Sequence, residues 1–243
     1  MSETDKFCSS SKLTEEEQKL CCKFHADLLD ILADLDKKDY LRSELKVKQG
    51  EEERIYSEHV ITNVREVSDA FNKLSDMYCD KERQKKFLEL NKPYGMTKKH
   101  LNYLFLSDMI FVFLQNIEAF RVFLLFILKL PIRYSFKEKY KRIGERTTLR
   151  PLLNSLKELG IEKANTLDVI DYGLRNGLSH CLFWLDRNSD SEHPRPHLCY
   201  SKDITFKRIR CVSIDNFLSK SRKQAIYTIC LSYVILDWFR FAQ

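Results

Sequence analysis

The order of apolar and polar residues predicts a helix near the start of the chain. Five apolar residues recur every three or four positions and share one helical face: Leu20, Phe24, Leu28, Ile31 and Leu35. Thr14 and Glu17 have the spacing of a capping box at the N-terminus of this helix. A one-sided apolar seam of the same period predicts a second helix over residues 52–78.

Four more helices are predicted downstream, and helix breakers mark where two of them end. They span residues 97–130, 151–159, 166–181 and 215–241. Pro131 stops the first of these, a long apolar helix with Thr97 as its cap, because proline cannot continue a helical hydrogen-bond ladder. Gly160 ends the second, as glycine commonly does after the last helical turn.

Between the last two predicted helices the pattern changes to short aromatic and β-branched runs. These runs are CLFWLD, PHLCYS and ITFKRIRCVS, and the polar turn RNSDSEHPRP follows the first of them. The sequence therefore predicts a mainly α protein, with a small β-hairpin or a three-stranded sheet before the last helix.

Composition agrees with a folded, mostly helical protein. Hydrophobic residues make up 44% of the chain, and only six glycines and five prolines interrupt it. The 41 basic and 35 acidic residues give a formal net charge of +6, which suits a protein that approaches phosphates and equally suits an ordinary soluble surface. This composition excludes a disordered chain.

Residues 109–130 resemble a membrane span, but their polar residues argue against one. Gln115, Asn116, Glu118 and Arg121 lie in the interior of this stretch. A charged group near the centre of a bilayer costs about 2.5–3.5 kcal/mol even on the most lenient scale. We expect a buried core helix here and no membrane partner.

The eight cysteines include no CxxC pair, and the first residues of the chain are polar and charged. Neither feature is typical of a disulfide-dense secreted domain or of a cleavable leader. We therefore expect buried thiols and a cytoplasmic location.

Three Arg–His pairs of similar spacing occur in the chain, and their surroundings separate them. Arg54 and His59 lie in a run of acidic residues, which indicates a solvated helix face, and the near match over 187–193 lies in a polar turn. Arg175 and His180 instead end a predicted helix that has an apolar face. The residues of that face are Leu167, Ile170, Leu174 and Leu178.

The chemistry of this last pair suits RNA cleavage. At about 100° per residue, five positions place the two side chains roughly 140° apart around a helix, so that they flank a groove. Asn176 can hydrogen-bond on the side of His180, and Gly177 lets another surface approach the backbone. Arginine holds phosphate as a permanent cation, and histidine exchanges a proton near neutral pH. Together they could cleave RNA through its own 2′-hydroxyl, with no metal or cofactor.

The segment LRNGLSH, residues 174–180, resembles the signature of the HEPN superfamily. That signature is an arginine, usually followed by asparagine or another polar residue, a few positions before a histidine, and Arg175, Asn176 and His180 match it. The resemblance implies a helical up-and-down bundle over about 98–243, with a β insertion at about 182–213. Residues 1–97 would form an N-terminal helical extension.

The resemblance also implies an activity. Active members of the superfamily are metal-independent endoribonucleases that leave a 2′,3′-cyclic phosphate, in antiviral defence, toxin or RNA-processing settings. Two subunits bring their motif helices together, which would place two copies of Arg175 and His180 in one composite cleft of a homodimer. A regulatory or antitoxin protein is a further partner that such a setting would supply.

Many HEPN proteins also carry an acidic residue on the helix before the motif, and Glu118 is the candidate here. Asp108, Gln115 and Glu118 form a polar line on an otherwise apolar helix. An ion pair between Glu118 and Arg121 would account for the same residue structurally.

Two other groups of residues carry weaker signals. His193, His197 and Cys199 lie within seven residues, but no fourth ligand stands at a spacing typical of zinc sites, so we expect no metal. The basic, aromatic segments 85–100 and 133–146 could guide a single-stranded nucleic acid or could be solvated loops.

The alternative to an enzyme is a non-catalytic HEPN-like scaffold. Arg175 and His180 would then serve dimerisation or nucleotide binding, and the N-terminal helices would engage a protein partner. Glycine-rich phosphate loops and Ser/His/Asp arrangements are not found in the sequence, which disfavours kinase and serine-hydrolase chemistry.

Overall fold

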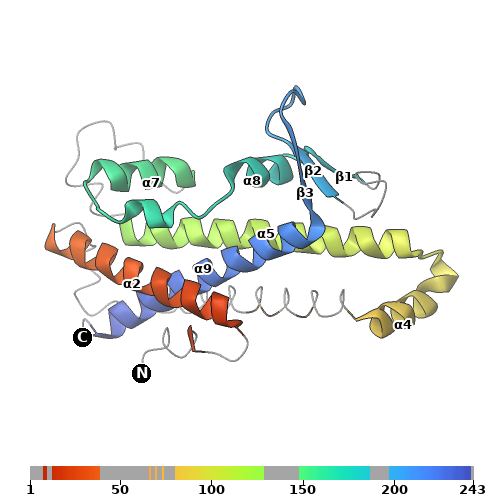
Figure 1. Ribbon diagram of the computed structural model, residues 1–243, viewed down its shortest axis with the longest axis horizontal. Coiled ribbons are helices and arrows are strands. Elements are labelled where there is room, and N and C mark those ends of the chain that lie inside the picture. Colours follow the sequence, from red (N-terminus) through yellow and green to blue (C-terminus); the bar gives the residue numbers. More distant parts are fainter. Residues whose placement is uncertain are drawn as a thin grey trace. The chain divides into compact units, whose positions relative to one another are not determined.

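A computed structural model describes residues 8–9, 13–38, 66, 69, 73, 80–128, 148–186 and 197–241, and these residues are mainly helical (Figure 1). Six α-helices are described: α2 (Glu15–Lys37), α4 (Lys81–Asn91), α5 (Lys98–Leu128), α7 (Leu149–Glu158), α8 (Tyr172–Ser179) and α9 (Ile214–Phe241). Two 3₁₀ turns, η2 (Lys92–Tyr94) and η4 (Ala164–Leu167), join them. The strands are β1 (Phe183–Asp186), β2 (His197–Ser201) and β3 (Ile209–Ser213).

The predicted start of α2 is confirmed at atomic level. The backbone N–H of Thr14 donates to the Glu17 carboxylate at 2.8 Å, and the backbone N–H of Glu17 donates to the Thr14 hydroxyl at 3.3 Å. This reciprocal capping box satisfies two N–H groups that a helix start leaves without partners. The helix predicted over 52–78 falls almost wholly outside the described residues.

The prediction of one helix over 166–181 is wrong, because the chain breaks there into η4 and the shorter helix α8. Asp171 acts as the N-cap of α8, since its carboxylate accepts the backbone N–H of Leu174 at 3.0 Å. Thr166 turns its hydroxyl back to the carbonyl of Lys163. Short polar side chains of this kind compete with the helical ladder for backbone groups, which apolar periodicity does not register.

The three predicted strands form one antiparallel sheet in the order β1-β2-β3, directly before α9. Trp184 pairs with Cys199 and Cys199 with Cys211, whereas Phe183 pairs with Tyr200 and Tyr200 with Arg210. Directly paired residues project to the same side of a sheet, so these two rows lie on opposite faces. The start of the predicted third strand, residues 204–208, instead belongs to the turn between β2 and β3.

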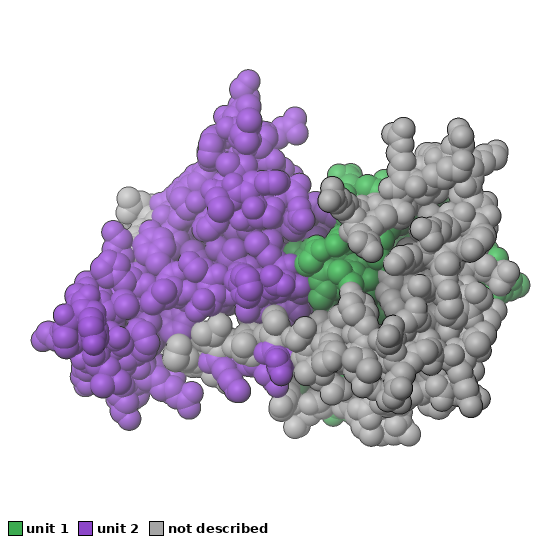
Figure 2. Space-filling view, turned by 180° about the vertical axis from the view of Figure 1, so that it is seen from behind, with its two compact units in different colours: residues 1–64, 117–169, 226–243 green, residues 65–116, 170–225 purple. Residues whose placement is uncertain are grey.

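The chain divides into two compact units, coloured in Figure 2: residues 1–64, 117–169 and 226–243 form unit 1, and residues 65–116 and 170–225 form unit 2. In unit 1 the N-terminal helix α2 packs on α9. The ring of Phe24 meets that of Tyr227 edge-on, with centroids 4.6 Å apart, and stacks on Phe120 of α5. Leucines fill the same core, including Leu35, Leu152 and Leu156, each about 1% exposed or less.

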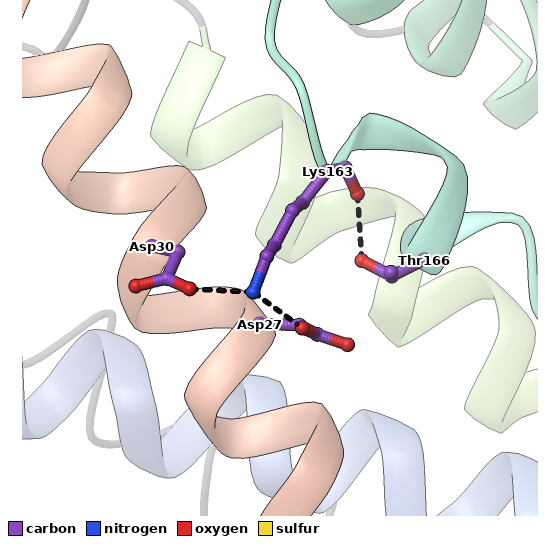
Figure 3. A network of polar contacts seen from close by, with 4 residues as sticks. All are labelled: Asp27, Asp30, Lys163 and Thr166. Atoms are coloured by element: carbon purple, nitrogen blue, oxygen red, sulfur yellow. Dashed lines mark hydrogen bonds and ion pairs between the residues drawn. The ribbon is translucent and has the colours of Figure 1, made fainter.

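An ion-pair network connects η4 to α2 at the surface of unit 1 (Figure 3). The Lys163 ammonium donates to Asp27 at 2.9 Å and to Asp30 at 2.6 Å. Hydrogen bonds to Asp30 and Asp27 raise the pKa of Lys163 above its ordinary value. The two carboxylates lie on neighbouring turns of α2, so a single cation spans both.

Unit 2 is built around the first part of α5, the first part of α9, α8 and the sheet. Phe113 of α5 and Phe217 of α9 form an edge-on pair with ring centroids 5.6 Å apart. Leu174 and Leu178 of α8 are buried, as the sequence predicts for the apolar face of the motif helix. Tyr200 of β2 is among the largest fully buried side chains.

Four cysteines are paired in the structure, which corrects the expectation of free thiols for these residues. Cys8 is bonded to Cys21 in unit 1, and Cys199 is bonded to Cys211 across β2 and β3 in unit 2. Cys199 and Cys211 are direct cross-strand partners with Cα atoms 4.0 Å apart, a relation that depends on strand register. Cys230 is a buried thiol, as the sequence led us to expect, whereas the free thiols of Cys22 and Cys181 are exposed, which corrects that expectation for these two residues.

Within the described part of the chain, none of the helices combines the length and the apolar character that a membrane crossing requires. In α5, apolar side chains such as Phe120 and Leu124 are buried against protein, as predicted for a core helix.

Candidate functional site

The start of α8 is fixed by Asp171. Besides capping Leu174, the carboxylate of Asp171 accepts a hydrogen bond from Lys220 of α9 at 2.7 Å. Burial raises the pKa of Asp171, but the hydrogen bonds from Lys220 and Leu174 outweigh it, so the pKa lies below its ordinary value. Asp171 is therefore a carboxylate at neutral pH and ties the motif helix to α9.

The inner face of α8 packs directly on the sheet, and Gly177 is the point of closest approach. A Cβ at Gly177 would lie 2.9 Å from both Cβ and Cδ2 of Tyr200 and 3.0 Å from the Ser201 carbonyl oxygen. The surface whose approach the glycine was expected to permit is therefore strand β2 of the same chain. Gly177 is explained by packing of α8 on β2, and this contact holds the helix rigidly.

The end of α8 is a Schellman motif that places His180 at the C-cap. The backbone N–H of Leu182 donates to the Gly177 carbonyl at 2.8 Å, and the N–H of Cys181 donates to the Leu178 carbonyl at 3.2 Å. Cys181 has φ 57°, the left-handed conformation that glycine usually supplies at this position. His180 is exposed and immediately precedes the turn into the sheet.

Arg175 and Asn176 lie on the outer side of the same helix and contact each other. The guanidinium of Arg175 donates to the side-chain oxygen of Asn176 at 3.1 Å. Asn176 was expected to hydrogen-bond beside His180; its side chain contacts Arg175 instead, and its backbone carbonyl accepts the His180 N–H at 3.1 Å. Among the described residues, the side chains of Arg175 and His180 make no hydrogen bond to each other.

Polar and charged side chains on the inner and outer sides of α8 differ in their partners. Tyr200, on the inner side of α8, lies near Asp171 and Arg210. Burial raises the pKa of Tyr200, Asp171 adds to that rise, and Arg210 opposes it. In the part of the chain that the structure describes, neither Arg175 nor His180 enters an ion pair. The half-exposed guanidinium of Arg175 and the exposed imidazole of His180 thus lie at the surface of unit 2.

Glu118 forms an ion pair with Arg121, the structural alternative that the sequence offered. Arg121 donates to its carboxylate from one turn further along α5, within unit 1. Arg175, Asn176 and His180 belong to unit 2. The role of Glu118 in a cleft therefore stays a prediction that rests on the resemblance alone.

The possible metal site at His193, His197 and Cys199 has no free thiol, because Cys199 is bonded to Cys211. His197 begins β2, and His193 lies outside the described residues, as do Arg54, His59 and segment 133–146. Over the described ranges, one other group has metal-ligand geometry: the sulfurs of Cys8, Cys21 and Cys230 lie within 4.8 Å of one another. Two of these sulfurs already form a disulfide, and burial raises the pKa of the Cys230 thiol, which disfavours the thiolate that a metal needs.

One feature near the motif was missed when CLFWLD was interpreted only as a strand. Trp184 of β1 is 38% exposed, and its ring faces that of Phe206, 46% exposed, with centroids 6.2 Å apart. Phe206 lies in the turn between β2 and β3, so the pair forms only when the sheet does. A lone tryptophan in a short strand was the only signal in the sequence.

Comparisons with protein-family models, with curated proteins and with solved structures found no match to this chain. A function can therefore be inferred only from the residues of α8 and from the resemblance of its motif.

Proposed function

We propose that this protein is a metal-independent endoribonuclease that uses Arg175 and His180. The observation that carries the proposal is the way α8 is held. Its inner face and both ends are fixed by Asp171, Gly177 and the Schellman turn, while the outer side chains engage no carboxylate among the described residues. A fold that needed these side chains for stability would pair them, as it pairs Lys163.

In the proposed reaction, the 2′-oxygen of a ribose attacks the adjacent phosphorus and the bond from phosphorus to the 5′-oxygen breaks. The imidazole of His180 accepts the 2′-hydroxyl proton or donates a proton to the leaving 5′-oxygen. The guanidinium of Arg175 stabilises the negative charge on the pentacoordinate phosphorus, and Asn176 orients that guanidinium. The products are a 2′,3′-cyclic phosphate and a 5′-hydroxyl, and no water is consumed.

A homodimer with two motif helices facing one cleft would supply one histidine as base and the other as acid. We propose this arrangement on the resemblance to HEPN proteins. Glu118 is retained as a candidate for the same cleft on that ground, and a toxin or defence role with a masking protein partner is proposed on it as well.

The test is RNA cleavage in the presence of EDTA. We expect wild-type protein to cut single-stranded RNA, to leave 2′,3′-cyclic ends, and to spare a 2′-O-methyl strand that has no free 2′-hydroxyl. His180→Ala and Arg175→Ala should each lower the rate by at least about a hundredfold while circular dichroism stays unchanged. The matched control is Arg54→Ala/His59→Ala, which removes the other pair of the same spacing and should cut normally.

Mixing the two inactive variants tests the composite cleft. A dimer of one Arg175→Ala and one His180→Ala subunit still holds one arginine and one histidine, so partial activity should return. Wild-type protein that leaves RNA intact, or His180→Ala that cuts at the wild-type rate, would reject the enzyme in favour of the non-catalytic scaffold.

A further inference from the structure

The pair formed by Trp184 and Phe206 lies close along the chain to the motif and is exposed. Trp184 follows His180 by four residues, a span of at most about 14 Å of extended chain. The two rings are tilted by 50° with centroids 6.2 Å apart, and neither is buried. Exposed apolar side chains that are contiguous, unlike scattered ones, commonly mark a binding surface.

The sheet supports this pair rigidly. Trp184 shares a face with Cys199 and Cys211, whose disulfide joins β2 to β3 in the same row. The other face carries Tyr200, which packs on Gly177 of α8. The aromatic pair is therefore on the face of the sheet turned away from that contact, and the β2–β3 hairpin that carries Phe206 projects beyond α8 (Figure 1).

The backbone of Phe206 adopts an unusual conformation in the turn. Phe206 has φ 55°, a left-handed conformation that aromatic residues rarely adopt. The backbone N–H of Phe206 donates to the Asp203 carbonyl at 3.3 Å, which closes the turn. This turn holds an unfavourable conformation at the residue whose ring meets Trp184.

Two exposed cations, Lys207 and Arg208, follow Phe206 directly in the turn. Lys202 and Arg210 lie on the α8 side of the sheet, because Lys202 approaches Gly173 of α8 and Arg210 hydrogen-bonds to Tyr200. The acid of this segment, Asp203, is bound within the turn by the N–H and the hydroxyl of Thr205. The hydrogen bond from the Thr205 hydroxyl is the main cause that lowers the pKa of Asp203. Lys207 and Arg208 thus place positive charge next to Phe206, which is complementary to a polyanion.

We propose that Trp184 and Phe206 form a stacking platform for unpaired bases of single-stranded RNA, with Lys207 and Arg208 contacting its phosphates. Exposed aromatic rings beside cations bind single strands in this way, because every base offers a π face and every linkage a negative charge. The platform rests on the proposed nuclease function for its role, since it would hold the substrate a few nucleotides from His180.

The test measures binding apart from cleavage. The probe is a fluorescein-labelled 2′-O-methyl oligouridine of about twelve nucleotides, titrated with protein and followed by anisotropy. Trp184→Ala and Phe206→Ala should each weaken binding about tenfold or more, and Trp184→Phe should restore most of it. Lys207→Ala should reduce the salt dependence of binding by about one counterion. Tyr94→Ala removes another exposed aromatic side chain of unit 2, 84% exposed, and should change nothing.

A spectroscopic readout locates the contact. Trp184 and Trp238 are the two tryptophans of the chain, so in Trp238→Phe all tryptophan emission comes from Trp184. Binding of the oligouridine should quench that emission, as stacking requires. Unchanged affinity in folded Trp184→Ala, or a change only in its oligomeric state, would overturn the platform and would identify the pair as structural or as a protein contact.

The outcomes for the platform and for the nuclease are separable. His180→Ala should bind the probe like wild type, because it lacks only the proton-transfer group. Binding that depends on Trp184 without any cleavage of ordinary RNA would reject the nuclease and retain the binding surface. Cleavage by His180 with unchanged binding and unchanged KM in Trp184→Ala would reject the platform and retain the nuclease.

Discussion

Lys163 in unit 1 and Arg175 in unit 2 are both cations placed beside a short helical segment, and the chain treats them in opposite ways. Lys163 lies between two carboxylates of α2, and its pKa is raised by those contacts. Arg175 donates to the neutral amide of Asn176. The first cation holds segments together, and the second makes no ion pair among the described residues, as the proposed phosphate contact requires. This difference in partners distinguishes the two cations more clearly than the number of basic residues does.

The largest effect should come from the contact beneath the motif. Gly177→Val drives a side chain into Tyr200 and the Ser201 carbonyl, and we expect a loss of about 2–3 kcal/mol in the free energy of unfolding. Urea denaturation measures it. Ser179→Val, at an exposed position of the same helix, controls for helix propensity and should cost far less. Tyr200→Ala should reduce the cost of Gly177→Val, and strict additivity of the two would show that they do not touch.

A substitution at the end of the same helix should stabilise the protein. Cys181→Gly relieves a left-handed residue and should raise the free energy of unfolding by about 1 kcal/mol. Cys181→Ala keeps a side chain in that conformation and should bring no gain. Cleavage should stay within about twofold of wild type, since the C-cap geometry of His180 is preserved. A loss of stability in Cys181→Gly would contradict the Schellman end.

The ion pair at the start of α8 should show a pH signature. Asp171→Asn keeps a cap for Leu174 but loses the charge that meets Lys220, and we expect a cost of about 1 kcal/mol at neutral pH. Because the pKa of Asp171 is lowered on folding, its contribution is present above the ordinary pKa of about 4 and is lost as the pH falls below it. The difference in urea midpoint between wild type and Asp171→Asn should therefore shrink on acidification, and a constant difference would contradict this account.

The smallest effect should come from the cation of unit 1. Lys163→Met removes both contacts to α2, and we expect a slightly lower melting temperature at low salt that returns toward wild type at high salt, since exposed ion pairs are screened. RNA cleavage should be unchanged. A marked loss of cleavage in Lys163→Met at wild-type stability would break the distinction between the two cations.

Much of the fold follows from local patterns. The capping box of α2 and the breaker at Gly160 act through neighbouring backbone groups, and the aromatic and β-branched runs before α9 carry a local preference for strands, so a sequence reveals them. The split between η4 and α8 was missed, because Asp171 and Thr166 compete for backbone groups in a way that periodicity does not show. Three residues of the candidate site, Arg175, Asn176 and His180, were identified from spacing and from their apolar frame.

By itself, the sequence determined which residues bring a guanidinium and an imidazole to the chain, the groups that phosphate binding and proton transfer need. Only the tertiary structure decided how they are held: Gly177 meets Tyr200, Asp171 meets Lys220, and Trp184 meets Phe206 across segments distant along the chain. Such contacts depend on strand register and on helix packing, which no local window contains. For the same reason Cys199 and Cys211 look like separate thiols in the sequence and are bonded in the folded protein.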